Sequence, residues 1–217
     1  MTTRSLFPLL ALVLSVGALS PGLQAAARES APKLISTTGA GARWKDVAEM
    51  KRMAQAGDAE ACLEMGILEE NGGEQPPDYI EARIWYERAA AKGMAEADFR
   101  LGKLVSEGLG GSENQEVAFQ HYMKAAQVGI ALAQYNVGAM LASGRGTRRD
   151  YVEGLAWLIV ATRDAAVDPE GERQLRGHLA RRPGDITAAE KRAERLIAML
   201  ADRKAKADGE TAQPARR

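Results

Sequence analysis

The side chains able to do acid, base or nucleophilic chemistry are few in this 217-residue sequence, and they lie far apart. There is one cysteine, Cys62, and there are two histidines, His121 and His178, with no His-x-x-x-His or Cys-x-x-Cys spacing of the kind that binds metals. No Gly-x-Ser-x-Gly elbow and no Gly-x-x-x-x-Gly-Lys phosphate-binding loop occurs either. We therefore expect no catalytic residue, no metal site and no cofactor.

Two clusters of like charge are explained most simply by solvation. Glu69 and Glu70 are adjacent carboxylates of the kind that usually faces water, and Arg145, Arg148 and Arg149 form a short basic segment. The chain as a whole balances 29 basic against 29 acidic side chains. Because binding to nucleic acid is driven largely by positive charge, we expect no nucleic-acid partner.

Small residues recur along the chain at a spacing of 36 positions, which indicates repeated elements rather than a single functional loop. Small residues are expected to recur in this way where neighbouring helices approach closely at the same point of each repeat. Four columns hold in three copies: Gly57, Gly93 and Gly129; Ala61, Ala97 and Ala133; Gly66, Gly102 and Gly138; Gly72, Gly108 and Gly144.

The 36-residue register indicates that two of the reactive side chains have packing roles. Cys62 aligns with Asp98 and Gln134 on a predicted helix, so we interpret it as a tolerated small residue rather than a reactive thiol. His121 occupies a column that holds tryptophan in the other copies, and we expect it to be a half-buried packing side chain. The aromatic columns are Trp85, His121 and Trp157, followed by Tyr86, Tyr122 and Leu158.

Each unit is predicted to form two helices separated by a glycine-rich loop. In the first helix, Ala61, Met65 and Leu68 fall at the spacing of one apolar stripe. The turn glycines are expected to take the left-handed conformation that ends a helix. Capping boxes, in which a polar residue caps the helix and a Glu three residues later returns a bond, are predicted at Asp78-x-x-Glu81, Asp150-x-x-Glu153 and Thr187-x-x-Glu190. The middle unit has Asn114 as its cap but Val117 in place of the Glu.

The repeat resembles a known family. The pattern Ala-x-x-x-Leu-Gly, a Gly-x-Gly loop and Asp-Tyr-x-x-Ala-x-x-Trp-Tyr-x-x-Ala-Ala-x-x-Gly is similar to the Sel-1-like repeat, a relative of the tetratricopeptide repeat. It is carried by residues 61–93, 97–129 and 133–163, and it departs from the family pattern at His121, Gly154 and Leu158. The resemblance implies an all-α fold, a right-handed α-solenoid of about three helix pairs with helical caps at both ends.

The domain organisation follows from these patterns. We expect a signal peptide at 1–27, a disordered linker at 28–43, a capping helix at 44–56, repeats at 57–92, 93–128 and 129–164, capping helices at 165–203 and a disordered tail at 204–217.

The N-terminus predicts export. Arg4 precedes an apolar run from Leu6 to Leu19, and the small residues Ala25 to Ala27 offer a cleavage site. The run is shorter than the roughly 20 residues that a membrane span needs, so we expect no stable membrane anchor after cleavage. No cysteine follows the run, which disfavours a lipoprotein. In a periplasmic or secreted setting, Cys62 has no second cysteine for an internal disulfide.

The resemblance implies a non-catalytic protein–protein interaction scaffold or adaptor in the bacterial cell envelope, with a protein or peptide as its partner. Two alternatives stay open, namely a secreted enzyme of the β-lactamase-like or peptidoglycan-linked type, and a structural subunit of an envelope or polysaccharide assembly. The first is disfavoured because such relatives carry a cysteine pair in each repeat. On the first helix of each unit, the expected solvent stripe takes in Glu60, Glu64, Glu96, Arg100, Lys103 and Asn136. These residues either form the partner-binding groove or only keep the helix soluble, and the sequence favours neither.

Overall fold

The computed structural model describes residues 43–72, 75–163 and 167–211. The predicted signal peptide, and the predicted linker apart from Arg43, lie outside these residues. Every regular element within the described ranges is an α-helix, and from Trp44 onward they belong to one compact unit. The fold is an all-α solenoid, as the sequence predicts.

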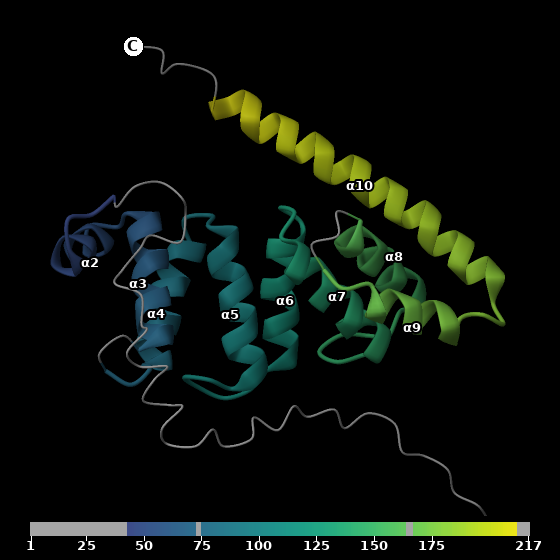
Figure 1. The fold of residues 1–217 in the computed structure, drawn as a ribbon, viewed down its shortest axis with the longest axis horizontal. Coiled ribbons are helices and arrows are strands. Elements are labelled where there is room, and N and C mark those ends of the chain that lie inside the picture. The colour runs from purple at the N-terminus through teal and green to yellow at the C-terminus, as the bar shows by residue number, and fades with distance from the viewer. Residues whose placement is uncertain (1–42, 73–74, 164–166, 212–217) are drawn as a thin grey trace, which may run out of the picture. The chain divides into compact units, whose positions relative to one another are not determined.

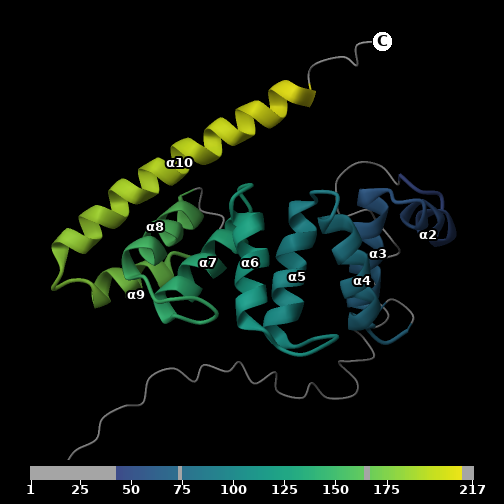
Figure 2. The same cartoon turned by 180° about the vertical axis from the view of Figure 1, so that it is seen from behind.

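The three units each form a pair of helices, which we name the A and B helices. The A helices are α3 (Ala59–Asn71), α5 (Ala95–Glu107) and α7 (Ala131–Ser143), and the B helices are α4 (Tyr79–Ala90), α6 (Gln115–Ala126) and α8 (Tyr151–Thr162). The helix α2 (Val47–Gln55) precedes them, and α9 (Glu170–His178) and α10 (Pro183–Thr211) follow. From α2 to α8 each helix packs against the next one in the chain (Figures 1 and 2).

Each B helix begins at the predicted cap, but the capping boxes are incomplete. Asp78 Oδ1 accepts hydrogen bonds from the N–H groups of Ile80 and Glu81, and Asp150 Oδ1 accepts one from Glu153. The predicted return bond from the Glu side chain is wrong in both boxes. The N–H of each cap donates instead to a carbonyl of the preceding A helix, at 2.9 Å for Asp78 to Glu69 and for Asp150 to Leu141, with Asn114 to Val105 at 3.1 Å in the middle unit. The cap therefore also ties the B helix to its A helix.

Glycines mark the places where a side chain would block close packing. A Cβ added at Gly102 of α5 would lie 2.7 Å from a ring carbon of Tyr122 on α6, so the aromatic ring lies directly on the helix backbone. In the loop after α5, a Cβ at Gly110 would overlap the carbonyl group of Tyr79 at the start of α4. The first contact closes a helix pair, and the second packs one unit against the unit before it.

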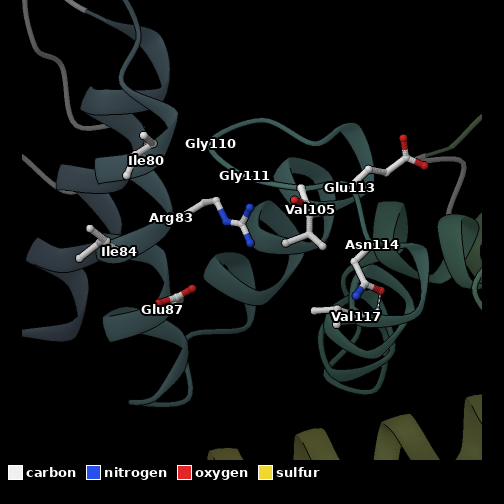
Figure 3. A pocket seen from close by; sticks show the side chains of 11 residues that line it. Ile80, Arg83, Ile84, Glu87, Val105, Gly110, Gly111, Glu113, Asn114 and Val117 are labelled. Carbon is white, nitrogen blue, oxygen red and sulfur yellow. Dashed lines mark hydrogen bonds between the residues drawn. The ribbon is translucent and has the colours of Figure 1, made fainter.

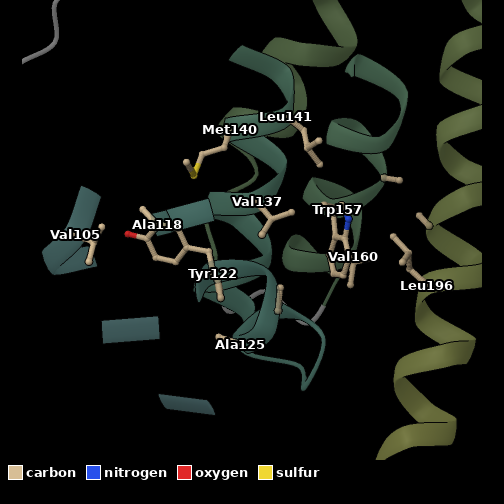
Figure 4. Packing of buried hydrophobic residues seen from close by; sticks show 14 residues of the cluster. Val105, Ala118, Tyr122, Ala125, Val137, Met140, Leu141, Trp157, Val160 and Leu196 are labelled. Atoms are coloured by element: carbon tan, nitrogen blue, oxygen red, sulfur yellow. The ribbon is translucent and has the colours of Figure 1, made fainter. Parts of the chain in front are cut away.

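Three groups of buried side chains form the interior, and the smallest of them lies between α8 and the last two helices. The N-terminal core runs from Met50 of α2 to Leu104 of α5, and the C-terminal core runs from Val105 of α5 to Leu196 of α10. Figure 4 shows the C-terminal core, with Val137 of α7 between Tyr122 of α6 and Trp157 of α8. The repeated small residues Ala61, Ala97 and Ala133 are fully buried in these cores.

The last two helices cover the third unit. Leu175 and Leu179 pack against α8 residues such as Leu155, and α10 lies along α8. Arg192 of α10 donates to both carboxylate oxygens of Glu153 on α8, at 2.7 and 3.0 Å. Both Figure 1 and Figure 2 show α10 running on past the ends of the neighbouring helices.

Two expectations about the C-terminus are wrong. The helix α10 begins at Pro183 rather than at Thr187, whose hydroxyl donates to the Pro183 carbonyl inside the first turn. It also continues to Thr211, so residues 204–211 are helical where the sequence predicts a disordered tail. Residues 212–217 of that tail lie outside the described ranges.

Candidate partner-binding face

Polar side chains from α3, α4 and α5 meet around the carboxylate of Glu70, whose side chain is only 9% exposed. The Tyr86 hydroxyl donates to Oε2 at 2.6 Å, and Arg100 Nη1 donates to the same oxygen at 3.0 Å. Lys103 Nζ donates to Oε1 at 3.0 Å, and Arg100 Nε also donates to Glu96 Oε1 at 2.9 Å. We call this network the Glu70 cluster. It joins the first unit to the A helix of the second.

The cluster is built to keep Glu70 ionised. Burial alone would raise the pKa of its carboxyl, but hydrogen bonds from Tyr86, Lys103 and Arg100 together with the charge of Lys103 outweigh burial and lower it. Burial raises the pKa of Tyr86, and the hydrogen bond to Glu70 raises it further. Burial would lower the pKa of Lys103, but the hydrogen bond and charge of Glu70 raise it. An anion between two cations is a structural tie rather than a poised acid or base.

A hollow of about 390 Å³ opens between the next pair of A helices, α5 and α7. We call it the α5–α7 hollow. Its lining includes Phe99, Lys103 and Ser106 of α5, Tyr122 of α6, Asn136 of α7 and Arg145 of the following loop. The hydroxyls of Ser106 and Tyr122 lie 3.3 Å apart. The lining combines an aromatic wall with several hydrogen-bond donors, which suits a polar group carried on a partner chain.

A second hollow, of about 460 Å³, lies on the other side of the helix pairs, between α4 and α6 (Figure 3). Ile80 and Ile84 line it from α4 and Val117 from α6, and Val105 of α5 also contributes. Arg83 reaches across it so closely that a Cβ at Gly111 would overlap its guanidinium. Its lining is more apolar than that of the α5–α7 hollow, although it includes the charged residues Arg83, Glu87 and Glu113.

The structure places the six predicted groove residues in different surroundings. Glu96, Arg100 and Lys103 belong to the Glu70 cluster, and Lys103 and Asn136 line the α5–α7 hollow. Glu64 Oε1 is buried with no hydrogen-bond partner among the described residues, and burial raises the pKa of this carboxyl against the opposing charge of Arg100. Glu60 lies in the first turn of α3 and lines neither hollow.

Comparison with known proteins identifies the repeat. The family model described as Sel1 repeat matches three times, at residues 59–94, 95–129 and 131–163. The crystal structure of a Sel1 repeat protein from Oxalobacter formigenes is 28% identical with a TM-score of 0.51, and the match covers 54% of this chain and 49% of that one. This chain is a Sel1 repeat protein.

A second solved structure is similar to this chain over a longer stretch. It is c5321, a protective antigen present in uropathogenic Escherichia coli strains and displaying an SLR fold, at 26% identity and a TM-score of 0.66. The match covers 79% of this chain but 36% of that one, so the Sel1 protein spans about half the length of the first relative and about a third of the second. Comparison with curated proteins gives no match. Sel1 repeat proteins generally act as scaffolds that mediate protein–protein interactions.

The repeat position that Cys62 occupies contributes to packing in this Sel1 repeat protein. Cys62 is 1% exposed, its Sγ donates to the Ala54 carbonyl at 3.4 Å, and burial raises the pKa of its thiol, which favours the unreactive protonated form. Two repeats later, Gln134 Nε2 donates to the matching carbonyl of Ala126 at 3.2 Å. Both side chains thus hold the end of the preceding helix.

In the middle repeat, the side chain at this position makes a different contact. Asp98 stands between Cys62 and Gln134 in this column, and a carboxylate cannot donate to a carbonyl. Its Oδ1 instead lies 2.8 Å from Nδ1 of His121, which replaces the tryptophan of the other repeats. His121 is 21% exposed at its side chain, and neither residue of this pair lines a hollow described above. The two departures from the repeat pattern therefore compensate each other.

The other candidate chemical groups also have packing roles. His178 packs against Tyr151, with the two rings tilted and their centroids 4.8 Å apart. In the basic segment, Arg149 donates to the Ser143 carbonyl at 2.9 Å, whereas Arg145 lines the α5–α7 hollow. Across the ranges that the structure describes, no group of three or more His, Cys, Asp or Glu side chains is placed to hold a metal ion.

Sequence reasoning missed the residues that define the two sites, Glu70, Ser106, Tyr122 and Arg145. The signal was present in the 36-residue register, which aligns Glu70 with Ser106 and Tyr86 with Tyr122. This signal is a difference between the copies, whereas the repeat pattern is defined by the residues that the copies share.

Proposed function

We propose that this Sel1 protein is an exported, non-catalytic adaptor that holds a protein or peptide partner against its A helices in the bacterial cell envelope. The general role of Sel1 repeats supports the interaction function. The observation that carries the proposal is the α5–α7 hollow, where Asn136 and Arg145 line an open space on the stacked repeats. In such repeat stacks, partners use the extended surface that neighbouring repeats create together.

Export is supported by the first 27 residues, with a cationic start, an apolar run and small residues at the expected cleavage site. None of the described helices has the length and apolar character to cross a membrane. To test export, the full chain would be expressed in its native host and recovered from the periplasmic and cytoplasmic fractions. We expect the periplasmic form to begin just after Ala25, Ala26 or Ala27 by N-terminal sequencing. Recovery of the uncleaved chain from the cytoplasm alone would contradict export.

The binding face can be tested by site-specific photo-crosslinking in the native host. A photo-reactive amino acid at Asn136 faces the α5–α7 hollow, and the same residue at Glu116, exposed on α6, is the matched control. We expect a defined adduct from position 136 and not from position 116, with the partner identified by mass spectrometry. Adducts of equal yield from both positions, or none from position 136, would contradict the proposed face.

A further inference from the structure

The repeats allow one interval between A helices to be compared with the next. Between α3 and α5, the carboxylate of Glu70 fills the space beside Tyr86 and is held by Arg100 and Lys103. One repeat later, between α5 and α7, Tyr122 stands in the place of Tyr86, but Ser106 stands in the place of Glu70. A hydroxymethyl group is too short to fill the space that the longer side chain occupies. The α5–α7 hollow is therefore the counterpart of the Glu70 cluster without its carboxylate.

The hollow keeps the tyrosine of the cluster but neither matched cation, since Ala139 stands in the place of Lys103, and other groups there can bind a carboxylate. Asn136 stands in the place of Arg100, and its side-chain amide forms no hydrogen bond within the part of the chain that the structure describes. Arg145 adds a guanidinium that pairs with no carboxylate in the described ranges. The Ser106 hydroxyl donates to the Lys103 carbonyl at 2.9 Å, and the Tyr122 hydroxyl, 3.3 Å from it, can turn toward a new acceptor. These donors match the acceptor oxygens of a carboxylate.

The charges around the hollow favour an anion but do not make the site strongly basic. Lys103 lies at the border between the two intervals and already donates to Glu70. Glu107 is the one acidic side chain among the lining residues, and it is exposed. Because Lys103 is already paired with Glu70, Arg145 is the cation of the lining that is left to face an anion of a partner. The aromatic ring of Phe99 offers an apolar contact for the methylene groups that carry a side-chain carboxylate.

We infer that the α5–α7 hollow binds the carboxylate of a glutamate side chain from the partner, in the position that Glu70 occupies one repeat earlier. This inference rests on the proposed adaptor function and adds the chemistry of the partner. A glutamate side chain is favoured over a chain-end carboxylate because the precedent within the protein is itself a glutamate. Arg145 and Asn136 are the residues that select it.

The test uses the full chain, immobilised, and defined pools of nonapeptides with randomised flanks. The first pool has a fixed central Glu with both ends blocked, the second has central Gln with both ends blocked, and the third has central Gln with a free C-terminal carboxylate. We expect the first pool to be retained about tenfold more than either of the others, by mass spectrometry of the eluted peptides. A tenfold ratio corresponds to about 1.4 kcal/mol of binding free energy. Equal retention of the Glu and Gln pools, no retention of any pool, or preferred retention of the third pool would overturn the inference.

Three surface variants locate the effect. Arg145→Gln and Asn136→Ala should each reduce retention of the Glu pool to the level of the Gln pool. Arg148→Gln is the matched control, because it removes a charge from the same loop at a residue outside the hollow, and it should retain the Glu preference. If Arg145→Gln keeps the full preference, or Arg148→Gln loses it, the hollow is not the binding site.

A measurement without any peptide checks the same idea. Ser106→Glu should place a carboxylate in the hollow from within the chain, and Ser106→Gln gives the same length without charge. At pH 7 we expect the Glu variant to melt at the higher temperature of the two and to lose the preference for the Glu pool. A lower melting temperature for the Glu variant would contradict a site that favours a carboxylate.

The two experiments together distinguish a failure of this inference from a failure of the proposed function. If photo-crosslinks form at position 136 but the peptide pools show no Glu preference, the adaptor function stands and the glutamate inference falls. If no crosslink forms at position 136 and no pool is retained, both fall.

Discussion

At the scale of single residues, Glu70 is held by three donors, and two of them require its negative charge. Tyr86 is a neutral donor that an amide oxygen could also satisfy, whereas Arg100 and Lys103 lose a counter-charge if the carboxylate is removed. Hydrogen bonds to charged groups contribute about 1.5–3 kcal/mol, more than neutral ones. The cluster should therefore depend on the ionisation of Glu70 more than on its shape.

Replacement of Glu70 by Gln should destabilise the protein by about 2 kcal/mol at pH 7. The folded state lowers the pKa of this carboxyl from its ordinary value of 4.5, so its stabilising effect is complete above that pH and is lost as the pH falls through the folded value. The melting temperatures of wild type and variant should thus converge in acid. Glu69→Gln, next to it on α3, is the control and should change little. A difference that stays constant from pH 7 into acid would rule out the ionic explanation.

Individual residues also show how far the sequence could predict the site. Arg100 and Lys103 were found because helical spacing places them on the solvent stripe of α5. Their partner Glu70 was interpreted as solvated because it is adjacent to Glu69 and belongs to a different repeat. Its contact with Arg100 spans 30 positions and depends on how two A helices pack, which spacing along one helix does not reveal.

At the scale of elements, the glycines of the A helices were predictable because the same steric demand occurs three times. The Cβ positions at Gly66 and Gly102 meet Tyr86 and Tyr122, and at Gly138 the Cβ position lies 2.7 Å from Leu158. The ends of α10 were not predictable in this way. Its contacts with the core stop near Leu200, and residues 201–209 are exposed, so no apolar pattern marks where the helix ends.

The substitution Gly102→Leu should weaken the crossing of α5 with α6. The added side chain would have to displace the ring of Tyr122, and overpacking of this kind costs about 1–3 kcal/mol. Gly177→Leu on α9 is the matched control, since nothing lies within 4 Å of its Cβ position. The control should leave the melting temperature unchanged or raise it, because leucine favours a helix more than glycine does. Equal melting temperatures for Gly102→Leu and wild type would mean that the crossing is not tightly packed.

At the scale of the whole described unit, the N-terminal core and the C-terminal core meet inside one helix. Leu104 of α5 belongs to the N-terminal core and Val105, the next residue, belongs to the C-terminal core. In a stack where each repeat contacts mainly its neighbours, stability is a sum of local terms, and distant repeats respond weakly to a local change. The sequence predicted this architecture from the repeat period, but the period alone could not show where one core ends and the next begins.

Ala97→Trp tests this division. Ala97 is fully buried in the N-terminal core, and a tryptophan there should force α5 away from its neighbours at a cost of about 1–3 kcal/mol or more. We expect hydrogen exchange to accelerate in α3 to α5, while amides in α7 and α8 stay protected, because their side chains pack in the C-terminal core. Ala201→Trp, at an exposed position of α10, is the control for the bulk of the added ring and should change neither region. A uniform loss of protection across both cores would instead show that the repeats unfold as one cooperative block, with the A helices coupled from end to end.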